Sequence, residues 1–94
     1  MPSPETSRIQ RQLGQAVKAV RADRQITQEE LSRRTTLHTT YISDVERGAR
    51  NPSWATIAKI ASGLGVEVAA IAAAYDQLAD EHHDGGNPAP AQRP

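Results

Sequence analysis

The feature that most constrains this chain is the stretch TQEELSRRTTLHTTYISDVERG, in which two helical patterns follow one another almost without a break. The first covers about residues 27–34 and opens with a capping box, because Thr27 is followed three residues later by Glu30. The second covers about residues 39–47 and runs into a glycine, which is typical of a helix end. A connection as short as residues 35–38 makes the two helices cross steeply instead of lying antiparallel, which is the helix-turn-helix geometry.

Apolar residues at helical spacing continue on both sides of this pair. They predict a first helix over about 7–24, a fourth helix capped by Ser53 and ended by Gly65, and a fifth over about 68–81. The inward faces are expected to carry Ile9, Leu13, Val17 and Val20 in the first helix, Trp54, Ile57, Ile60, Ala61 and Leu64 in the fourth, and Ile71, Tyr75 and Leu78 in the fifth. No strand alternation is visible, so the predicted fold class is all-α, a compact domain of five helices.

The ends of the chain differ from its middle in composition. Residues 1–6 contain two prolines and no periodicity, and residues 82–94 are rich in Gly and Pro and poor in apolar side chains. We expect a disordered leader over 1–6 and a disordered tail over 82–94, which leaves residues 7–81 as one domain. The run DEHHD at residues 80–84 is expected to be solvated and no metal site is predicted, since adjacent His residues do not present two nitrogens to one ion from a single helix face.

Charge is unevenly distributed, although the formal net charge of the 94 residues is zero. Residues 1–75 hold ten Lys and Arg against seven Asp and Glu, a balance of +3, and residues 76–94 have a balance of −3. Cysteine is absent, and the sequence has neither an apolar run of membrane-spanning length nor the apolar stretch of a signal peptide. We therefore expect a cytoplasmic protein without membrane contact.

The outward residues at the start of the second helix of the pair are short and polar. They are His38, Thr39, Thr40, Ser43 and Asp44. In a helix-turn-helix protein this helix lies in the major groove with its N-terminal residues facing the base edges. Hydroxyl groups can hydrogen-bond to several bases, the Thr methyl can touch a thymine methyl, and a carboxylate can accept from a cytosine amino group. Catalysis is not indicated, because the chain has no glycine-rich phosphate loop, nucleophile arrangement or carboxylate pair, and no cofactor is predicted.

Four pieces of the sequence, TQEEL, YISDVERG, RNPS and IAKIASGLGV, occur in an order and spacing that resemble the phage-repressor and Cro-type helix-turn-helix family. The resemblance runs from about Val17 to Leu78 and implies a lambda-repressor-like DNA-binding domain. It assigns base reading to Thr39, Thr40 and Asp44, with His38 and Ser43 at the margins, phosphate contacts to Gln28, Tyr41, Arg47, Arg50 and Asn51, and a partly buried ion pair to Arg21 and Glu46. For Arg24, near the turn before residue 27, a phosphate contact and a plain surface charge are equally favoured, whereas Arg33 and Arg34 favour a solvated face.

The chain departs from the family pattern at three positions. Thr36 stands where the turn usually has Gly, so we expect the turn to differ locally, because a β-branched residue tolerates the left-handed region poorly. His38 replaces the usual Ser or Thr cap, which weakens the start of the helix that follows it. Glu67 replaces a small cap before the fifth helix.

These observations favour a sequence-specific DNA-binding regulator, a repressor more readily than an activator. One helix-turn-helix unit buries too little surface for selective binding, so a homodimer on a pseudo-palindrome with half-sites about 10 bp apart, or a multiple of that, is expected. Such a protein would be nucleoid-associated. Ile71, Tyr75 and Leu78 either close the core or meet the second subunit, and we favour the subunit. The alternative is a protein-binding module, such as an antitoxin, whose acidic C-terminal segment engages a partner protein and folds on contact.

Overall fold

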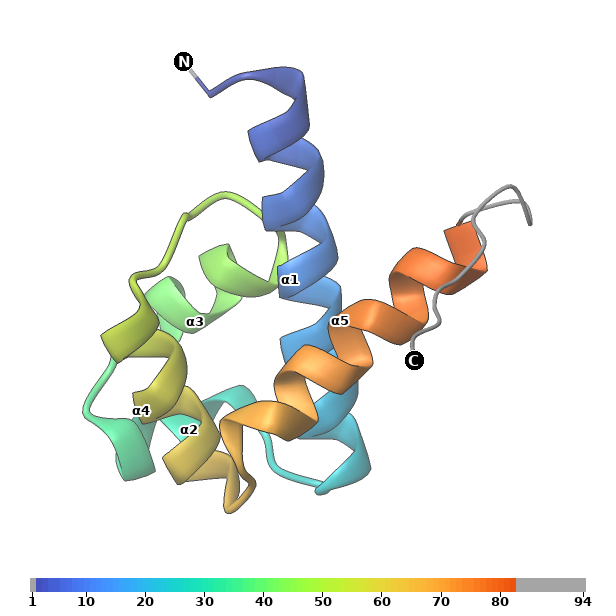
Figure 1. Ribbon diagram of the computed structural model, residues 1–94. Coiled ribbons are helices and arrows are strands. Elements are labelled where there is room, and N and C mark those ends of the chain that lie inside the picture. Colours follow the sequence, from blue (N-terminus) through green and yellow to red (C-terminus); the bar gives the residue numbers. More distant parts are fainter. Residues whose placement is uncertain (1, 83–94) are drawn as a thin grey trace.

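The computed structural model describes residues 2–82, which form five helices and no strand. The helices are α1 (Pro4–Asp23), α2 (Gln28–Thr35), α3 (Thr39–Glu46), α4 (Trp54–Leu64) and α5 (Val68–His82). Figure 1 shows α5 crossing α1 on one side of the molecule, while α2, α3 and α4 gather on the other side. The all-α prediction with five helices is confirmed, and residues 83–94, which include most of the predicted tail, lie outside the described residues.

The first helix begins earlier than predicted, inside the segment 1–6 that was expected to be disordered. Ser3 is its N-cap and accepts a hydrogen bond from the backbone N–H of Thr6 at 3.0 Å, and Pro4 follows with a fixed φ that suits a first helical position. The N-terminal end of α1 projects beyond the other helices (Figure 1). Ile9 lies in this region and is 40% exposed, so the prediction that it faces inward is wrong.

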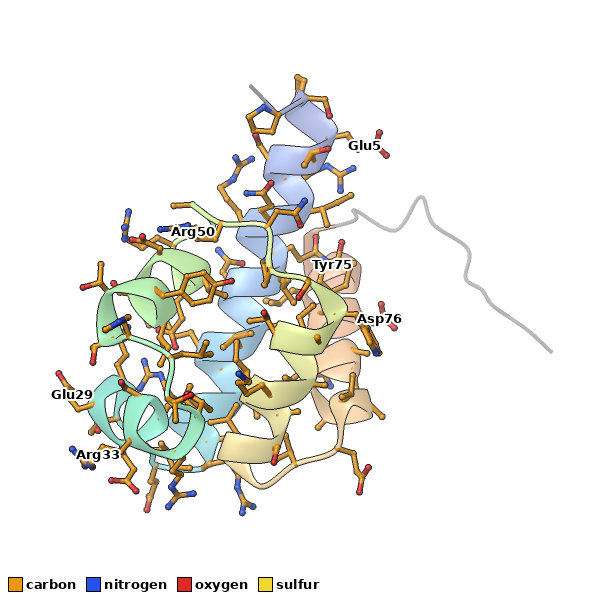
Figure 2. The ribbon with its side chains drawn as sticks, turned by 90° about the vertical axis from the view of Figure 1, so that its left-hand side faces the viewer. Glu5, Glu29, Arg33, Arg50, Tyr75 and Asp76 are labelled. Atoms are coloured by element: carbon orange, nitrogen blue, oxygen red, sulfur yellow. The ribbon has the colours of Figure 1, made fainter. Side chains whose placement is uncertain are left out.

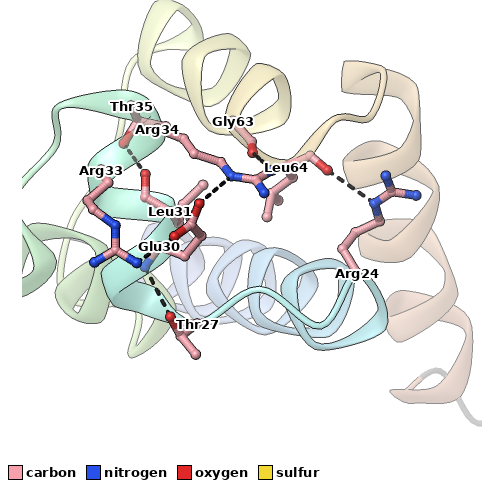
Figure 3. Close-up of polar contacts among 9 residues, drawn as sticks. All are labelled: Arg24, Thr27, Glu30, Leu31, Arg33, Arg34, Thr35, Gly63 and Leu64. Atoms are coloured by element: carbon pink, nitrogen blue, oxygen red, sulfur yellow. Dashed lines mark hydrogen bonds and ion pairs between the residues drawn. The ribbon is translucent and has the colours of Figure 1, made fainter.

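The second helix starts with half of the predicted capping box. The Thr27 hydroxyl accepts from the Glu30 N–H at 3.0 Å, but the Glu30 carboxylate pairs with Arg33 and Arg34 rather than with the N–H of Thr27 (Figure 3). The helix ends at Thr35, and the following C-cap residue Thr36 has φ 63° and ψ 10°. The turn therefore keeps the left-handed geometry that glycine usually supplies, and the expected local difference is absent.

The ends of α3 and α4 agree with those predicted from the sequence. His38 precedes α3 without a side-chain capping bond, as its residue type suggested, and Gly48 ends that helix at φ 81°. The Ser53 hydroxyl caps α4 by accepting from the Thr56 N–H at 3.1 Å. Gly65 closes α4 in the left-handed region at φ 74°.

The core lies where α1, α2, α3, α4 and α5 meet. Its largest fully buried side chains are Leu31, Ile42, Ile60, Leu64, Ile71, Val17 and Val45. Trp54, predicted to face inward, is 69% exposed, because the first residue of α4 lies outside the region that the other helices cover. Gly14 in the middle of α1 allows α3 to approach closely, since an added Cβ would lie 2.3 Å from the carbonyl oxygen of Val45.

Over residues 2–82, no single helix has the length and apolar character to cross a membrane. The pair α4 and α5 passes that test jointly by length and composition, although it is bent by 103° at its junction, and buried core helices pass the same test.

Candidate nucleic-acid interface

The N-terminal end of α3 projects from the surface. His38 and Thr40 are exposed and Thr39 and Ser43 are half-buried, while Ile42 on the opposite face of the helix is fully buried. One face of α3 is therefore fixed in the core and the other is available to a ligand. A single helix presented in this way fits the major groove of a duplex, which is about 12 Å wide.

Hydrogen bonds within the turn set the position of α3 relative to α2. The Ser32 hydroxyl donates to the carbonyl of Leu37, and the Leu37 N–H donates to the Thr35 hydroxyl at 3.2 Å. Thr35 in turn donates to the carbonyl of Leu31 at 2.7 Å from a buried position. The turn is thus linked to α2 by side chains, and this link compensates for the backbone strain at Thr36.

A buried ionic network joins α1 and α2 to the C-terminal end of α3. Arg21 of α1 donates to both carboxylate oxygens of Glu46, from Nε at 2.6 Å and from Nη2 at 3.0 Å, and donates from Nη1 to the carbonyl of Ile26 at 2.8 Å. The Arg21 and Glu46 side chains are 15% and 3% exposed. The hydrogen bond with Glu46 raises the pKa of Arg21 above its ordinary value against the opposing effect of burial, so Arg21 stays cationic.

Gln28 extends this network to the first turn of α2. Its side-chain amide donates to Oε1 of Glu46 at 3.0 Å, and the side chain is half-buried. A primary amide carries two N–H donors, so one hydrogen bond to Glu46 orients the group and leaves the second donor for another acceptor. Gln28 also opens α2, where backbone N–H groups favour an anion.

Two residues of α3 and two residues that follow it form a cluster that we call the arginine cluster, made of Tyr41, Asp44, Arg47 and Arg50. Asp44 accepts a hydrogen bond from Nη2 of Arg47, and its second oxygen lies 3.5 Å from Nε of Arg50. The Arg50 guanidinium lies over the Tyr41 ring, 5.2 Å from the ring centroid. Asn51 follows in the same loop and is exposed. The structure therefore brings together the phosphate-contact residues predicted at and after α3.

Arg24 is not part of the arginine cluster. Its Nε donates to the carbonyl of Leu64 at 3.1 Å, at the C-terminal end of α4 (Figure 3). Arg34 donates to the neighbouring carbonyl of Gly63 at 3.2 Å, so two arginines cap α4 where the helix dipole favours cations. The structure thus gives Arg24 a structural partner and places it apart from the residues near α3.

Arg34 and Arg33 lower the pKa of Glu30 through hydrogen bonds, and the hydrogen bond from Arg34 has the larger effect.

The three α5 residues predicted to meet a second subunit lie in different environments. Ile71 is 2% exposed and belongs to the core of the single chain, so for this residue the structure supports the alternative of core closure. Tyr75 and Leu78 are half-buried and pack against that core. A groove of about 180 Å³ runs between α1, α4 and α5, and its lining includes Leu13, Trp54, Ile57, Val68, Ile71 and Tyr75. Figure 2 shows Asp76, at its edge, on the side opposite Arg50.

Metal ligands are not gathered in the described part of the chain, where no group of three His, Cys, Asp or Glu residues could hold an ion. The side chains of the run DEHHD lie outside the described residues, so the prediction for that run remains a prediction.

The sequence model of the helix-turn-helix domain matches residues 12–80, which include both helices of the pair and the whole arginine cluster. The chain belongs to this family. The helix-turn-helix chain is 41% identical over 59 residues to the immunity repressor protein of Bacillus phage phi105, covering 63% of this chain and 41% of the repressor. It therefore spans about two fifths of that relative. It is also 44% identical over 63 residues to the control protein C.BamHI of Bacillus amyloliquefaciens, covering 66% of this chain and 78% of that protein.

A solved structure with a similar fold is the restriction-modification controller protein C.Esp1396I, crystallised as a tetramer in complex with its natural 35 base-pair operator. The TM-score is 0.69 and the identity 28%, with 73% of this chain and 91% of that chain covered. The similarity in fold extends over most of both chains. The lambda-repressor-like fold implied by the sequence resemblance is therefore confirmed.

Sequence reasoning missed several side-chain partners at this site. The pairing of Asp44 with Arg47 could have been anticipated from their i, i+3 spacing on a helix. The hydrogen bond from Gln28 to Glu46 and the approach of Arg50 to Asp44 depend on how the helices and the loop pack. No pattern in the neighbouring sequence predicts them.

Proposed function

We propose that this helix-turn-helix protein is a sequence-specific DNA-binding transcriptional regulator that acts as a repressor, in the cytoplasm and at the nucleoid, on a pseudo-palindromic operator bound by a homodimer. The observation that carries the proposal is α3, whose N-terminal end is exposed, whose C-terminal end is held by the buried ionic network, and which is flanked by the arginine cluster. The names of the relatives support it, since they are an immunity repressor and a control protein, and a protein of similar fold was crystallised with its operator.

In the proposed complex, α3 enters the major groove and the polar residues at its start face the base edges. Thr40 and His38 are exposed enough to reach bases directly, and Thr39 and Ser43 lie beside them. Hydroxyl groups of Thr and Ser donate and accept, so they can match either an N7 or an amino group. These residues therefore supply sequence preference.

Phosphate contacts on both sides of the groove fix the position of α3. On one side, Gln28 offers its second amide N–H and the N-terminal end of α2. On the other side, Arg47, Arg50 and Asn51 lie on the loop that leaves α3, and all three are exposed. Contacts of this type orient a protein on DNA without carrying sequence information.

The second subunit is proposed to cover the groove between α1, α4 and α5. A tryptophan that is 69% exposed beside an apolar groove is the kind of residue that anchors protein interfaces. Tyr75 lines the same groove, whereas Ile71 forms part of its floor. This arrangement leaves α3 of each subunit free to face DNA.

The test is selection of bound duplexes from a random pool, followed by affinity measurements on the selected sequence. We expect a two-fold symmetric motif with half-sites separated by about 10 bp or a multiple of it. Thr40→Ala should change the preferred base at one position in each half-site, and Gln28→Ala should weaken all sequences about equally. A purified protein that binds no duplex at low ionic strength would overturn the proposal.

The alternative of an antitoxin or adaptor depends on the C-terminal segment, most of which lies outside the described residues. It remains a prediction, and co-purification with a second small chain would support it.

A further inference from the structure

Asp44 differs from the other residues predicted to read bases because its carboxylate already has partners in the free protein. One oxygen accepts from Arg47, and the other lies 3.5 Å from Nε of Arg50. The Asp44 side chain is 17% exposed, whereas those of Arg47 and Arg50 are 64% and 54% exposed. A largely covered carboxylate thus holds two arginines whose side chains extend into solvent.

Tyr41 fixes the geometry of this group. It lies one helical turn before Asp44 on α3, and its ring stacks against the Arg50 guanidinium, 5.2 Å from guanidinium carbon to ring centroid. Planar guanidinium groups stack well on aromatic faces. Arg50 comes from the irregular loop after α3. It is therefore held from two sides by Tyr41 and Asp44 of α3.

The same carboxylate also changes the charge that the cluster presents to DNA. Two arginines alone carry a formal charge of about +2, and Asp44 lowers it to about +1. Ion pairs with exposed partners are weak, so a phosphate can replace Asp44 as the partner of each guanidinium. The displaced carboxylate then remains close to the duplex and repels it.

We propose that Asp44 is a positioning residue that orients Arg47 and Arg50 toward adjacent phosphates and also limits binding to duplexes that offer no matching base edge. The carboxylate repels every duplex alike. Its orientation of Arg47 and Arg50 improves binding only on a matching duplex, where Thr39 and Thr40 hold α3 in a single register. Asp44 therefore increases discrimination. The inference rests on the proposed function, because it concerns the same DNA-facing surface.

The experiment compares Asp44→Asn with the wild type on the selected operator and on a scrambled duplex, by fluorescence anisotropy over a series of salt concentrations. We expect the variant to bind the scrambled duplex roughly three- to fivefold more tightly, with a smaller gain on the operator, so that the affinity ratio falls. The slope of log affinity against log salt should steepen by about one, since one more positive charge faces the phosphates.

Two controls separate a local effect from a general one. Glu67→Gln removes the same charge from the exposed α4–α5 connection and should change neither the ratio nor the slope. In a chain that also carries Arg47→Ala and Arg50→Ala, Asp44→Asn should no longer lower the ratio of operator to scrambled affinity, because the arginines that Asp44 orients are gone. Thermal melting of each variant shows whether it is folded.

The outcomes distinguish this inference from the proposed function. If the wild type binds its operator but Asp44→Asn leaves the scrambled affinity and the salt slope unchanged, the inference is wrong and the proposed function stands. If Asp44→Asn loses preference at one base position without gaining scrambled affinity, Asp44 is a base reader and the inference is again wrong. If the wild type binds no duplex, the proposed function itself fails.

Discussion

Replacing Gly14 with Ala tests how closely α1 and α3 pack beneath the DNA-facing surface. A Cβ at this position would lie 2.3 Å from the carbonyl oxygen of Val45 and 2.6 Å from that of Glu46. Ordinary carbon–oxygen contacts begin near 3.3 Å, so the two helices would have to separate locally by roughly 1 Å. The obstacle is backbone, which cannot rotate out of the way as a side chain can.

The expected magnitude is a difference of two opposing effects. Alanine is a better helix former than glycine by about 1 kcal/mol in a helix interior, which favours the variant. Overpacking in a close-packed region costs about 1–3 kcal/mol, and the backbone clash at Gly14 places it at the upper end. We expect a net loss of about 2 kcal/mol, which lowers the melting temperature by roughly 8–16 °C in a domain of this size.

Gly63→Ala is the matched control, because Gly63 also lies in a helix. Its added Cβ would meet side-chain atoms, Cγ2 of Thr35 at 2.5 Å and Cδ1 of Leu31 at 2.9 Å, which can shift more readily than a carbonyl. Circular dichroism melts of the two variants should therefore show the larger fall for Gly14→Ala. A Gly14→Ala protein that melts at or above the wild-type temperature would show that the gain in helix propensity prevails and that the close approach of α1 and α3 is not required.

Four further predictions follow from single contacts. Thr36→Gly should raise the free energy of unfolding by about 1 kcal/mol in denaturant titrations, because Thr36 has φ 63°; an unchanged midpoint would mean that the turn is unstrained. Glu46→Ala should lower it by about 3 kcal/mol, since it leaves the Arg21 charge largely buried without its partner, and a loss below 1 kcal/mol would contradict the importance of the pair. Trp54→Ser should weaken self-association at least about tenfold in sedimentation equilibrium with little change in melting temperature, because Trp54 is 69% exposed; unaltered association would exclude it from the interface. Glu30 has a lowered pKa, so its ionised form stabilises the fold above the ordinary carboxyl pKa. The melting-temperature advantage of wild type over Glu30→Gln should be present at neutral pH and disappear as the pH falls through the lowered pKa of Glu30, and an advantage that persisted in strong acid would not come from ionisation.

Much of the secondary structure could be predicted from local sequence because helix ends are set by near neighbours. Thr27 and Ser53 each cap the N–H of the residue three positions later, and Gly48 and Gly65 supply the positive φ that ends a helix. Thr36 is the informative exception. Its residue type suggested a different turn, yet it adopts φ 63°, because bonds from Ser32 and Thr35 and the packing of α2 on α3 stabilise that geometry.

Exposure along the helices was harder to predict, because periodicity shows only that a residue lies on the apolar face. Ile9 and Trp54 lie on such faces and remain exposed, since each is at a helix start where no other element covers it. Ile71 has the same apolar character and is buried, because it packs into the core that the helices share. Whether an apolar residue is buried in the core thus depends on how long the neighbouring helices are and where they cross.

The sequence by itself determined five helices, the Thr27 and Ser53 caps and the exposed polar start of α3, because these follow from spacing and from contacts within a few residues. Only the tertiary structure decided which polar groups meet across the chain. Glu46 receives Arg21 and Gln28 from two other helices, and Asp44 holds the loop residue Arg50. Such partners are brought together by the angles at which helices cross, and these angles are set by the packing of the whole core and by close approaches such as that at Gly14.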